Sequence, residues 1–154
     1  MFVIRSFEPK DEHSVVHLWE SCALTRPWNN PYDDIRRSVE HSSSALLVAQ
    51  IAATDGSRDD PAVCGSVMVG SDGHRGWVYY LAVAPTYRIQ GLGRRLMLEA
   101  EQWLRARDVP KIQAMIRRDN LAVRGFYGRL GYEDGDVQLV QKWLSDEENG
   151  GSSP

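Results

Sequence analysis

One stretch of the chain, residues 81–96, constrains the possible folds more than any other. An apolar run ends at Pro85, and Arg88, Gly91 and Gly93 then lead into an amphipathic helix pattern. This order predicts a strand, a tight turn and a helix N-terminus. The first N–H groups of a helix have no partner within it and carry partial positive charge. A glycine-lined approach lets an anion such as phosphate accept them at close range, so the stretch predicts an anion site.

The residues that follow predict a strand–helix–strand unit. Apolar side chains recur at spacings of four and three over residues 92–104, as in a helix with one buried face. The helix is expected to stop near Arg107, because Pro110 cannot continue it. Residues 111–116 are then predicted to form a second buried strand. Two parallel strands joined by a helix need a right-handed crossover.

The turn lacks the phosphate-binding motifs of nucleotide folds. A dinucleotide fingerprint would place a third glycine at Leu96, and a Walker loop would continue as Gly-Lys-Ser or Gly-Lys-Thr. The pattern Arg88-x-x-Gly91-x-Gly93 after a strand instead resembles the acyl-CoA loop of the GNAT superfamily of N-acetyltransferases. Taken alone, the motif is also compatible with a glycine turn that feeds a purely structural helix.

A second segment, residues 119–132, resembles the other signature of that superfamily. Asp119 or Asn120 can cap a helix there, and Gly131 lies where a left-handed residue is favoured at a helix end. Two such motifs in this order, separated by one helix and one strand, would rarely arise by chance. The resemblance covers residues 60–143, whereas residues 1–60 fit the family's order of elements without a diagnostic motif. The matching positions are Asn120, Ala122, the pair Phe126-Tyr127 and the ending Leu130-Gly131-Tyr132.

The resemblance implies an α+β (α/β-like) GNAT fold of the kind found in small bacterial members. We expect a mixed central sheet of six to seven strands with a V-shaped splay, and about four helices on its two faces. A length of 154 residues suits one domain, placed at residues 1–144. The acidic and Gly/Ser-rich residues 145–154 are expected to form a disordered tail.

Local signals predict the remaining elements. Strands are expected at 2–5, 45–52 and 136–143, helices from Pro9 to about Leu24 and from Pro31 to near His41, a polar turn at 54–61, and a hairpin of 63–69 with 77–83 about Asp72-Gly73.

Composition bears on partners and compartment. A net charge of −3 gives no general reason to expect nucleic-acid binding. Cys22 and Cys64 have neither metal-site nor disulfide-framework spacing. The apolar start is too short for a signal peptide, and no run approaches a membrane span. We therefore expect a cytoplasmic protein without nucleic-acid or membrane partners. The resemblance implies an amine acceptor, a peptide or a small molecule, as its partner, and a homodimer is left open.

The resemblance implies acetyl-CoA as co-substrate, and no metal is expected. The pantetheine arm would lie along residues 81–83, and backbone N–H groups of residues 89–94 would hold the pyrophosphate. Arg88 and Arg94 could add positive charge or be solvated surface side chains. Ile89 stands where the family often has glycine, and we expect it to keep an ordinary φ with its side chain outward. The implied cofactor contacts are Leu81, Ala82, Val83, Arg88, Ile89, Gln90, Gly91, Leu92, Gly93, Arg94, Asn120 and Tyr127.

The implied reaction is direct attack of a neutral amine on the thioester in a ternary complex. A backbone N–H near Leu81 would stabilise the oxyanion, and Tyr127 matches the family's proton donor to the leaving thiolate. A core aromatic is the alternative role for Tyr127. Asn120 would reach the pantetheine amides, cap its helix, or do both. The strand Trp77–Val83 carries no acid, so the general base stays unassigned. An α-amine is favoured over lysine because a larger fraction of it is neutral near pH 7.5.

Acceptor-side residues are expected around the loop between the first two helices: Trp28, Asn29 and Tyr32, with Tyr80 on the neighbouring strand. Asp33 and Asp34 could attract a cationic amine, but acids in a first helical turn also stabilise a helix. His13 and His17 lie one helical turn apart without a third ligand, so no metal site is expected.

The competing function is a non-catalytic acetyl-CoA-binding sensor or interaction module. The missing acid supports it, whereas Tyr127 and Asn120 argue against it.

Overall fold

The computed structural model describes residues 1–52 and 61–145 of the chain. The polar turn expected at residues 54–61 and the tail expected at 145–154 lie outside the described residues, apart from Pro61 and Ser145. The elements in order are β1 (Phe2–Ser6), a 3-10 turn η1 (Pro9–Asp11), α1 (Glu12–Ser21), α2 (Pro31–Glu40), β2 (Ser44–Ile51), β3 (Val63–Ser71), β4 (Gly76–Val83), a 3-10 turn η2 (Pro85–Tyr87), α3 (Leu92–Arg105), β5 (Ile112–Ala114) and α4 (Leu121–Arg129).

The chain forms two compact units, which are described separately. The first consists of Met1–Thr25 and Asn30–Met115, and it contains the whole sheet. The second consists of Arg26–Asn29 and the chain from Ile116 onwards, and it contains α4.

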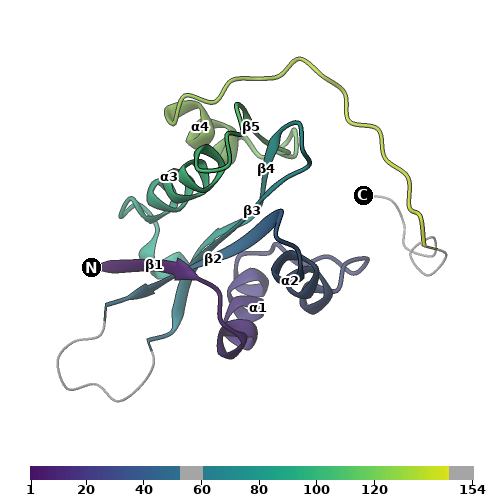
Figure 1. Ribbon diagram of the computed structural model, residues 1–154. Helices are drawn as coiled ribbons and strands as arrows, with labels where there is room; N and C mark the ends of the chain where they lie inside the picture. The colour runs from purple at the N-terminus through teal and green to yellow at the C-terminus, as the bar shows by residue number, and fades with distance from the viewer. Residues whose placement is uncertain (53–60, 146–154) are drawn as a thin grey trace. The chain divides into compact units, whose positions relative to one another are not determined.

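The sheet has its five strands in chain order, β1-β2-β3-β4-β5. The first four are antiparallel neighbours, and β5 is parallel to β4. Helix α3 covers one face of the sheet, and α1 and α2 cover the other (Figure 1). The expected α+β fold, mixed sheet and four helices are therefore confirmed, but the expected six to seven strands are wrong.

The missing strand is the one expected at residues 136–143. The segment begins in a turn that a side chain closes. The Asp136 N–H donates to Asp134 Oδ1 at 3.3 Å, and Asp136 has a φ of 49°. The segment then runs without a ladder partner among the described residues, and its apolar side chains Val137, Leu139 and Val140 are 81%, 60% and 85% exposed. Alternating hydrophobicity predicts a strand only where a neighbouring strand supplies hydrogen bonds.

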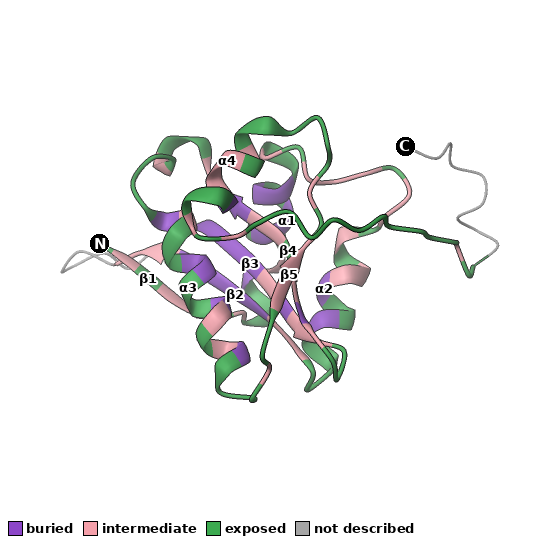
Figure 2. Cartoon of the chain, turned by 90° about the horizontal axis from the view of Figure 1, so that it is seen from above, coloured by how far each residue is buried: buried purple, intermediate pink, exposed green. Residues whose placement is uncertain are grey.

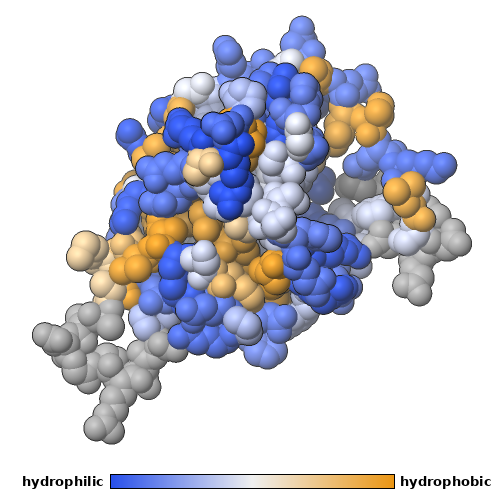
Figure 3. All heavy atoms as spheres, viewed as in Figure 1, coloured by the Kyte–Doolittle hydropathy of each residue, from blue (hydrophilic) through white to orange (hydrophobic). Residues whose placement is uncertain are grey.

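Buried apolar residues on both faces of the sheet form the core of the first unit. Figure 2 shows buried positions along the central strands and on parts of the helices beside them. On the α1 and α2 face, Trp19 and Val48 are fully buried, and Ile35 is 1% exposed. On the other face, α3 lies so close that a Cβ added at Gly65 would come within 3.0 Å of Leu96 Cδ1. The outward surfaces of the helices are mostly polar, and apolar side chains gather between them along the flank of the sheet near β1 (Figure 3). Hydrophobic burial on two faces therefore fixes the strands that carry the site.

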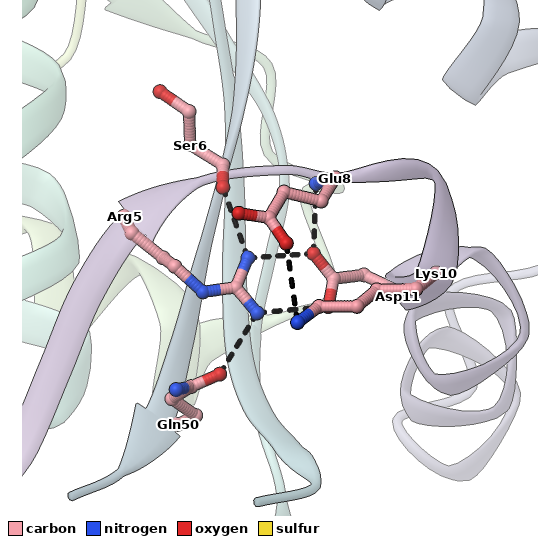
Figure 4. Close-up of polar contacts among 6 residues, drawn as sticks. All are labelled: Arg5, Ser6, Glu8, Lys10, Asp11 and Gln50. Carbon is pink, nitrogen blue, oxygen red and sulfur yellow. Dashed lines mark hydrogen bonds and ion pairs between the residues drawn. The ribbon is translucent and has the colours of Figure 1, made fainter. Parts of the chain in front are cut away.

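A polar cluster ties β1 to η1 and β2 (Figure 4). The Arg5 guanidinium donates to both carboxylate oxygens of Asp11, at 2.7 and 2.9 Å, and to Gln50 Oε1 at 2.8 Å. The Glu8 N–H also donates to Asp11 Oδ2 at 2.8 Å. Burial alone would raise the pKa of Asp11, but the hydrogen bonds from Arg5 and Glu8 outweigh it and bring the pKa below its usual value.

The second unit has the helix caps that its sequence predicts. The Asn120 side-chain oxygen accepts the Val123 N–H at 3.2 Å and so caps the start of α4. At the other end Gly131 has a φ of 89°, and the Tyr132 N–H donates to the Tyr127 carbonyl at 3.0 Å, which is a Schellman ending. Both expected caps are confirmed.

Candidate functional site

The edge of β4 opens after three residues of pairing with β5. Parallel pairing runs from Gly76 opposite Ile112 to Val78 opposite Ala114 and ends there. Among the described residues, the rest of β4 is paired along its β3 edge only. Successive strand residues present their N–H and C=O groups to opposite edges, and the Ala84 N–H donates to a β3 carbonyl at 2.9 Å. Val83 therefore presents its backbone groups to the open edge, where the resemblance implied a splay.

A bulge interrupts β4 next to this edge. Ser66 is opposite Ala82 and Met68 is opposite Tyr79, so β4 has one residue more than β3, and Tyr80 has a φ of 50°.

A buried hydrogen-bond chain holds the bulge. The Trp19 Nε1–H donates to Ser66 Oγ at 2.9 Å, and the Ser66 hydroxyl donates to the Tyr80 carbonyl at 2.9 Å. Trp19 and Ser66 are both 0% exposed. The sequence analysis missed this pair of residues. The available signal was a serine in the middle of an apolar strand, because a buried hydroxyl needs partners.

Arg88 ties the turn after β4 back to the strand end. Its Nε donates to the Val83 carbonyl at 3.2 Å, and its Nη2 lies 3.7 Å from Cys22 Sγ. The Cys22 thiol donates to the same carbonyl at 3.4 Å. Arg88 therefore contacts the end of β4, whereas the sequence predicted either a positive charge for the ligand or a solvated side chain. Arg94 is exposed in the first turn of α3.

Six consecutive backbone N–H groups between η2 and α3 have no acceptor among the described residues. The last turn bond of η2 comes from the Arg88 N–H, and the first bond of α3 comes from the Arg95 N–H, which donates to the Gly91 carbonyl at 3.1 Å. The N–H groups of residues 89–94 lie between these two bonds. The positive end of the 14-residue helix α3 adds partial charge at the same place. The turn can therefore hold an anion, and we call these six groups the amide cradle.

The backbone of the cradle requires left-handed conformations at two positions. Gly91, the N-cap of α3, has a φ of 79°, and a Cβ there would have no atom within 4 Å. Ile89 has a φ of 66°, so the expectation of an ordinary φ was wrong, although its side chain is fully exposed as expected. Alternation of left-handed and other residues turns successive N–H groups to one side, which makes an anion-binding concavity. For a branched residue this conformation costs about 1–2 kcal/mol.

The second unit contains the remaining motif residues. Tyr127 is 7% exposed, and its ring contacts Phe126 and Tyr132 edge-on, with centroids 5.2 and 5.3 Å away. Burial raises the pKa of Tyr127 to about 12, so its hydroxyl is protonated at neutral pH. The Asn120 oxygen makes the helix cap, and its amide NH₂ group, which has no acceptor among the described residues, is a possible donor to a ligand.

The structure distributes the sequence-predicted residues over the two units. The first unit holds Leu81, Ala82 and Val83 on β4, the loop and helix residues Arg88, Ile89, Gln90, Gly91, Leu92, Gly93 and Arg94, and the acceptor-side residues Tyr32 and Tyr80. The second unit brings Trp28 and Asn29 into one compact body with Asn120 and Tyr127.

Two other features bear on the predicted chemistry. Tyr32 is 39% exposed, and its hydroxyl lies 3.4 Å from His13 Nδ1. Within residues 1–52 and 61–145, no group of three His, Cys, Asp or Glu side chains could hold a metal ion. No helix in these ranges is long and apolar enough to cross a membrane.

An open strand edge and a helix N-terminus whose first N–H groups have no acceptor among the described residues suit a phosphate-containing ligand. The family model described as Acetyltransferase (GNAT) family matches residues 13–132. A relative described as an acetyltransferase, from Yersinia pestis (strain Pestoides F), is 44% identical over 141 residues, which cover 92% of this chain and 94% of the relative. The chain therefore belongs to the GNAT acetyltransferase family and is an acyltransferase.

Solved structures show the same fold at low identity. One is AAC(6')-Iy in complex with the bisubstrate analogue CoA-S-monomethyl-acetylneamine, with a TM-score of 0.75 at 12% identity, covering 94% of this chain and 99% of that one. Another is the ribosomal-protein-S18-alanine N-acetyltransferase from Escherichia coli, with a TM-score of 0.67 at 22% identity, covering 85% and 77%. Acetyl-CoA-dependent acetylation is general to the family.

Proposed function

We propose that this protein transfers the acetyl group of acetyl-CoA to a primary amine by direct attack within a ternary complex. Family membership supports the acetyl donor and the reaction class. The observation that carries the proposal is the amide cradle, whose six N–H groups come after η2, the turn that follows the open edge of β4.

The proposed cofactor position follows from these two features. The pyrophosphate accepts N–H groups of Ile89 to Arg94, and Arg94 adds positive charge beside them. The pantetheine arm then runs along Leu81–Val83, where the Val83 backbone faces the open edge of β4. This arm replaces the strand that β5 no longer provides after Val78. The NH₂ group of Asn120 is proposed as a further donor to the pantetheine amides.

The proposed chemistry uses a backbone N–H near Leu81 and the Tyr127 hydroxyl. The neutral amine attacks the thioester carbonyl, and the N–H stabilises the oxyanion of the tetrahedral intermediate. Collapse of the intermediate breaks the carbon–sulfur bond. Tyr127, which is protonated at neutral pH because burial raises its pKa to about 12, donates a hydrogen bond to the departing sulfur.

The proposed acceptor is a peptide α-amine or a small amine. An α-amine with a pKa of about 8 is neutral to a much larger extent at neutral pH than a lysine amine with a pKa of about 10.4. Two proteins that share the fold represent the two kinds of acceptor. One is a ribosomal-protein-S18-alanine N-acetyltransferase, and the other is solved in complex with a CoA conjugate of acetylneamine.

The cofactor site is tested with Gly91→Asp. The new carboxylate would face the pyrophosphate, and because like charges in contact cost several kcal/mol we expect CoA affinity to fall roughly 10²-fold or more by calorimetry. Gly73→Asp is the matched control. Gly73 has a comparable φ of 86° and equally open surroundings, but it lies at the tip of the β3–β4 hairpin. Equal CoA affinity of the two variants would refute the cradle assignment.

Transfer is tested by following free thiol while the wild-type protein is incubated with acetyl-CoA and a panel of peptide and small amines. Amine-dependent thiol release is the expected result. Tight CoA binding without such release would contradict the proposal and favour the non-catalytic binding module.

A further inference from the structure

Strand β4 carries no acid, but the structure brings one to it from α2. The Tyr80 hydroxyl donates to Asp34 Oδ2 at 2.6 Å, although the two residues are 46 positions apart in the sequence. An O–H···O⁻ bond of this length is charge-assisted. The phenol keeps its one proton and points it at the Asp34 carboxylate. Asp34 is also 3.6 Å from the Arg37 guanidinium, which keeps a cation beside the carboxylate.

The Tyr80 ring is held firmly at the start of the open edge. It stacks on Trp19 with a centroid distance of 3.7 Å and an interplanar angle of 11°. Its backbone carbonyl is fixed by Ser66, and its φ of 50° places it at the bulge immediately before Leu81. Tyr80 is half-buried, and the Asp34 side chain is 22% exposed, so the pair is accessible from solvent.

This hydrogen bond decides what the phenol oxygen offers to a substrate. A phenol has one proton to donate and two lone pairs that accept. Because the proton points to Asp34, the oxygen presents lone pairs to a ligand, and it suits an N–H donor such as an amine or ammonium group. The carboxylate behind it makes the oxygen a better acceptor.

We propose that the Tyr80–Asp34 pair binds the acceptor amine and takes its proton during acetyl transfer. The inference rests on the proposed function and supplies the base that β4 lacks. After the amine nitrogen bonds to the acetyl carbon, one N–H proton of the tetrahedral adduct moves to Tyr80 Oη. The phenol proton moves at the same time to Asp34 Oδ2, which becomes a neutral carboxylic acid and later releases the proton to water. Tyr80 ends the step as a neutral phenol, because it gains one proton and loses another. Asp34 does not touch the amine and acts through Tyr80, by positioning the phenol and accepting its proton.

The test compares Tyr80→Phe and Asp34→Asn with the matched control Tyr79→Phe. Tyr79 is the preceding residue on β4, is 44% exposed, and lies outside the proposed pair. CoA affinity is measured by calorimetry, and kcat and KM are measured by thiol release with the fastest acceptors from a panel of alkyl amines, amino-sugars and peptides with free α-amines. We expect Tyr80→Phe to reduce kcat/KM roughly 10²-fold, the lower end for a positioned base, and Asp34→Asn to reduce it in the same direction. CoA affinity should be unchanged in all three variants.

A second readout separates proton transfer from a merely structural role. In the tetrahedral adduct, the N–H of a strongly basic alkyl amine is less acidic than the N–H of a weakly basic amine such as methoxyamine. Transfer to the alkyl amine therefore depends more on the base. Tyr80→Phe should therefore slow the alkyl amine more than methoxyamine, whereas a displaced β4 would slow both equally. Equal loss with both amines, or Tyr80→Phe turnover equal to that of Tyr79→Phe, would overturn the proposal while leaving the transferase function intact. If wild-type protein binds CoA but turns over no amine of the panel, the proposed transfer fails and this inference fails with it.

Discussion

Removal of the Ser66 hydroxyl should destabilise the protein far more than its size suggests. Ser66 is fully buried between Trp19 and the bulge, and its oxygen both accepts the Trp19 Nε1–H and donates to the Tyr80 carbonyl, each at 2.9 Å. In Ser66→Ala the indole N–H loses its only hydrogen-bond partner among the described residues. The Tyr80 carbonyl loses the bond that fixes the bulge.

The magnitude follows from the two groups left behind. A buried donor or acceptor without its partner costs about 1–3 kcal/mol. The indole N–H lies on a side chain that is 0% exposed and should pay most of this cost, whereas a carbonyl retains a second lone pair and should pay less. We expect the free energy of unfolding to fall by about 2–4 kcal/mol in total. For a protein of this size that corresponds to a decrease in Tm of roughly 5–15 °C.

The assay is a double-mutant cycle in urea, followed by circular dichroism, with Trp19→Phe as the second substitution. Trp19→Phe keeps an aromatic ring against Tyr80 but removes the N–H, so Ser66→Ala should cost about 1–2 kcal/mol less in that background. A Ser66→Ala protein within about 0.5 kcal/mol of wild type, or additive effects of the two substitutions, would refute the reasoning.

Two further predictions test the β1 cluster and the proposed donor. Asp11→Asn should lower the free energy of unfolding by about 2–4 kcal/mol at pH 7, because it leaves the Arg5 guanidinium without its carboxylate. The folded-state pKa of Asp11 lies below the usual 3.8, so in wild type this stability is present above pH 4 and is lost as the pH falls through the folded-state pKa. Urea titrations of wild type and Asp11→Asn at pH 7 and pH 3 check this prediction. A difference in the free energy of unfolding between the two proteins that does not shrink at pH 3 would contradict it. Tyr127→Phe should leave CoA affinity unchanged and reduce kcat roughly 10²-fold in the thiol-release assay, and an unchanged kcat would show that Tyr127 is only a core aromatic.

Features that depend on a few adjacent residues were predictable from the sequence. The hairpin about Asp72-Gly73 forms as expected, and the Asp72 carboxylate accepts the His74 and Arg75 N–H groups at 2.9 and 2.7 Å. The Asn120 cap and the Gly131 ending also follow from local chemistry, since each is closed by hydrogen bonds within one or two helical turns. The same holds for the glycine turn before α3, where Gly91 is the left-handed N-cap of the helix.

Features that depend on distant segments were not predictable. The bulge at Tyr80 is held by Ser66 and Trp19, and the carboxylate beside it comes from α2, so neither contact could be found along the sequence of β4. Ile89 has a left-handed φ although its side chain disfavours it, because the turn imposes this conformation. The strand expected at residues 136–143 fails for a related reason, since an alternating pattern does not specify a pairing partner.

The amide cradle is tested most directly by two-dimensional ¹H–¹⁵N NMR during titration of ¹⁵N-labelled protein with CoA. Hydrogen bonds to a charged phosphate should shift the N–H resonances of residues 89–94 more than those of any other segment. Pantetheine, the part of CoA that lacks the pyrophosphate, should leave these six resonances nearly unmoved. The account is contradicted if CoA binds while the six resonances stay in place, or if pantetheine moves them as far as CoA does.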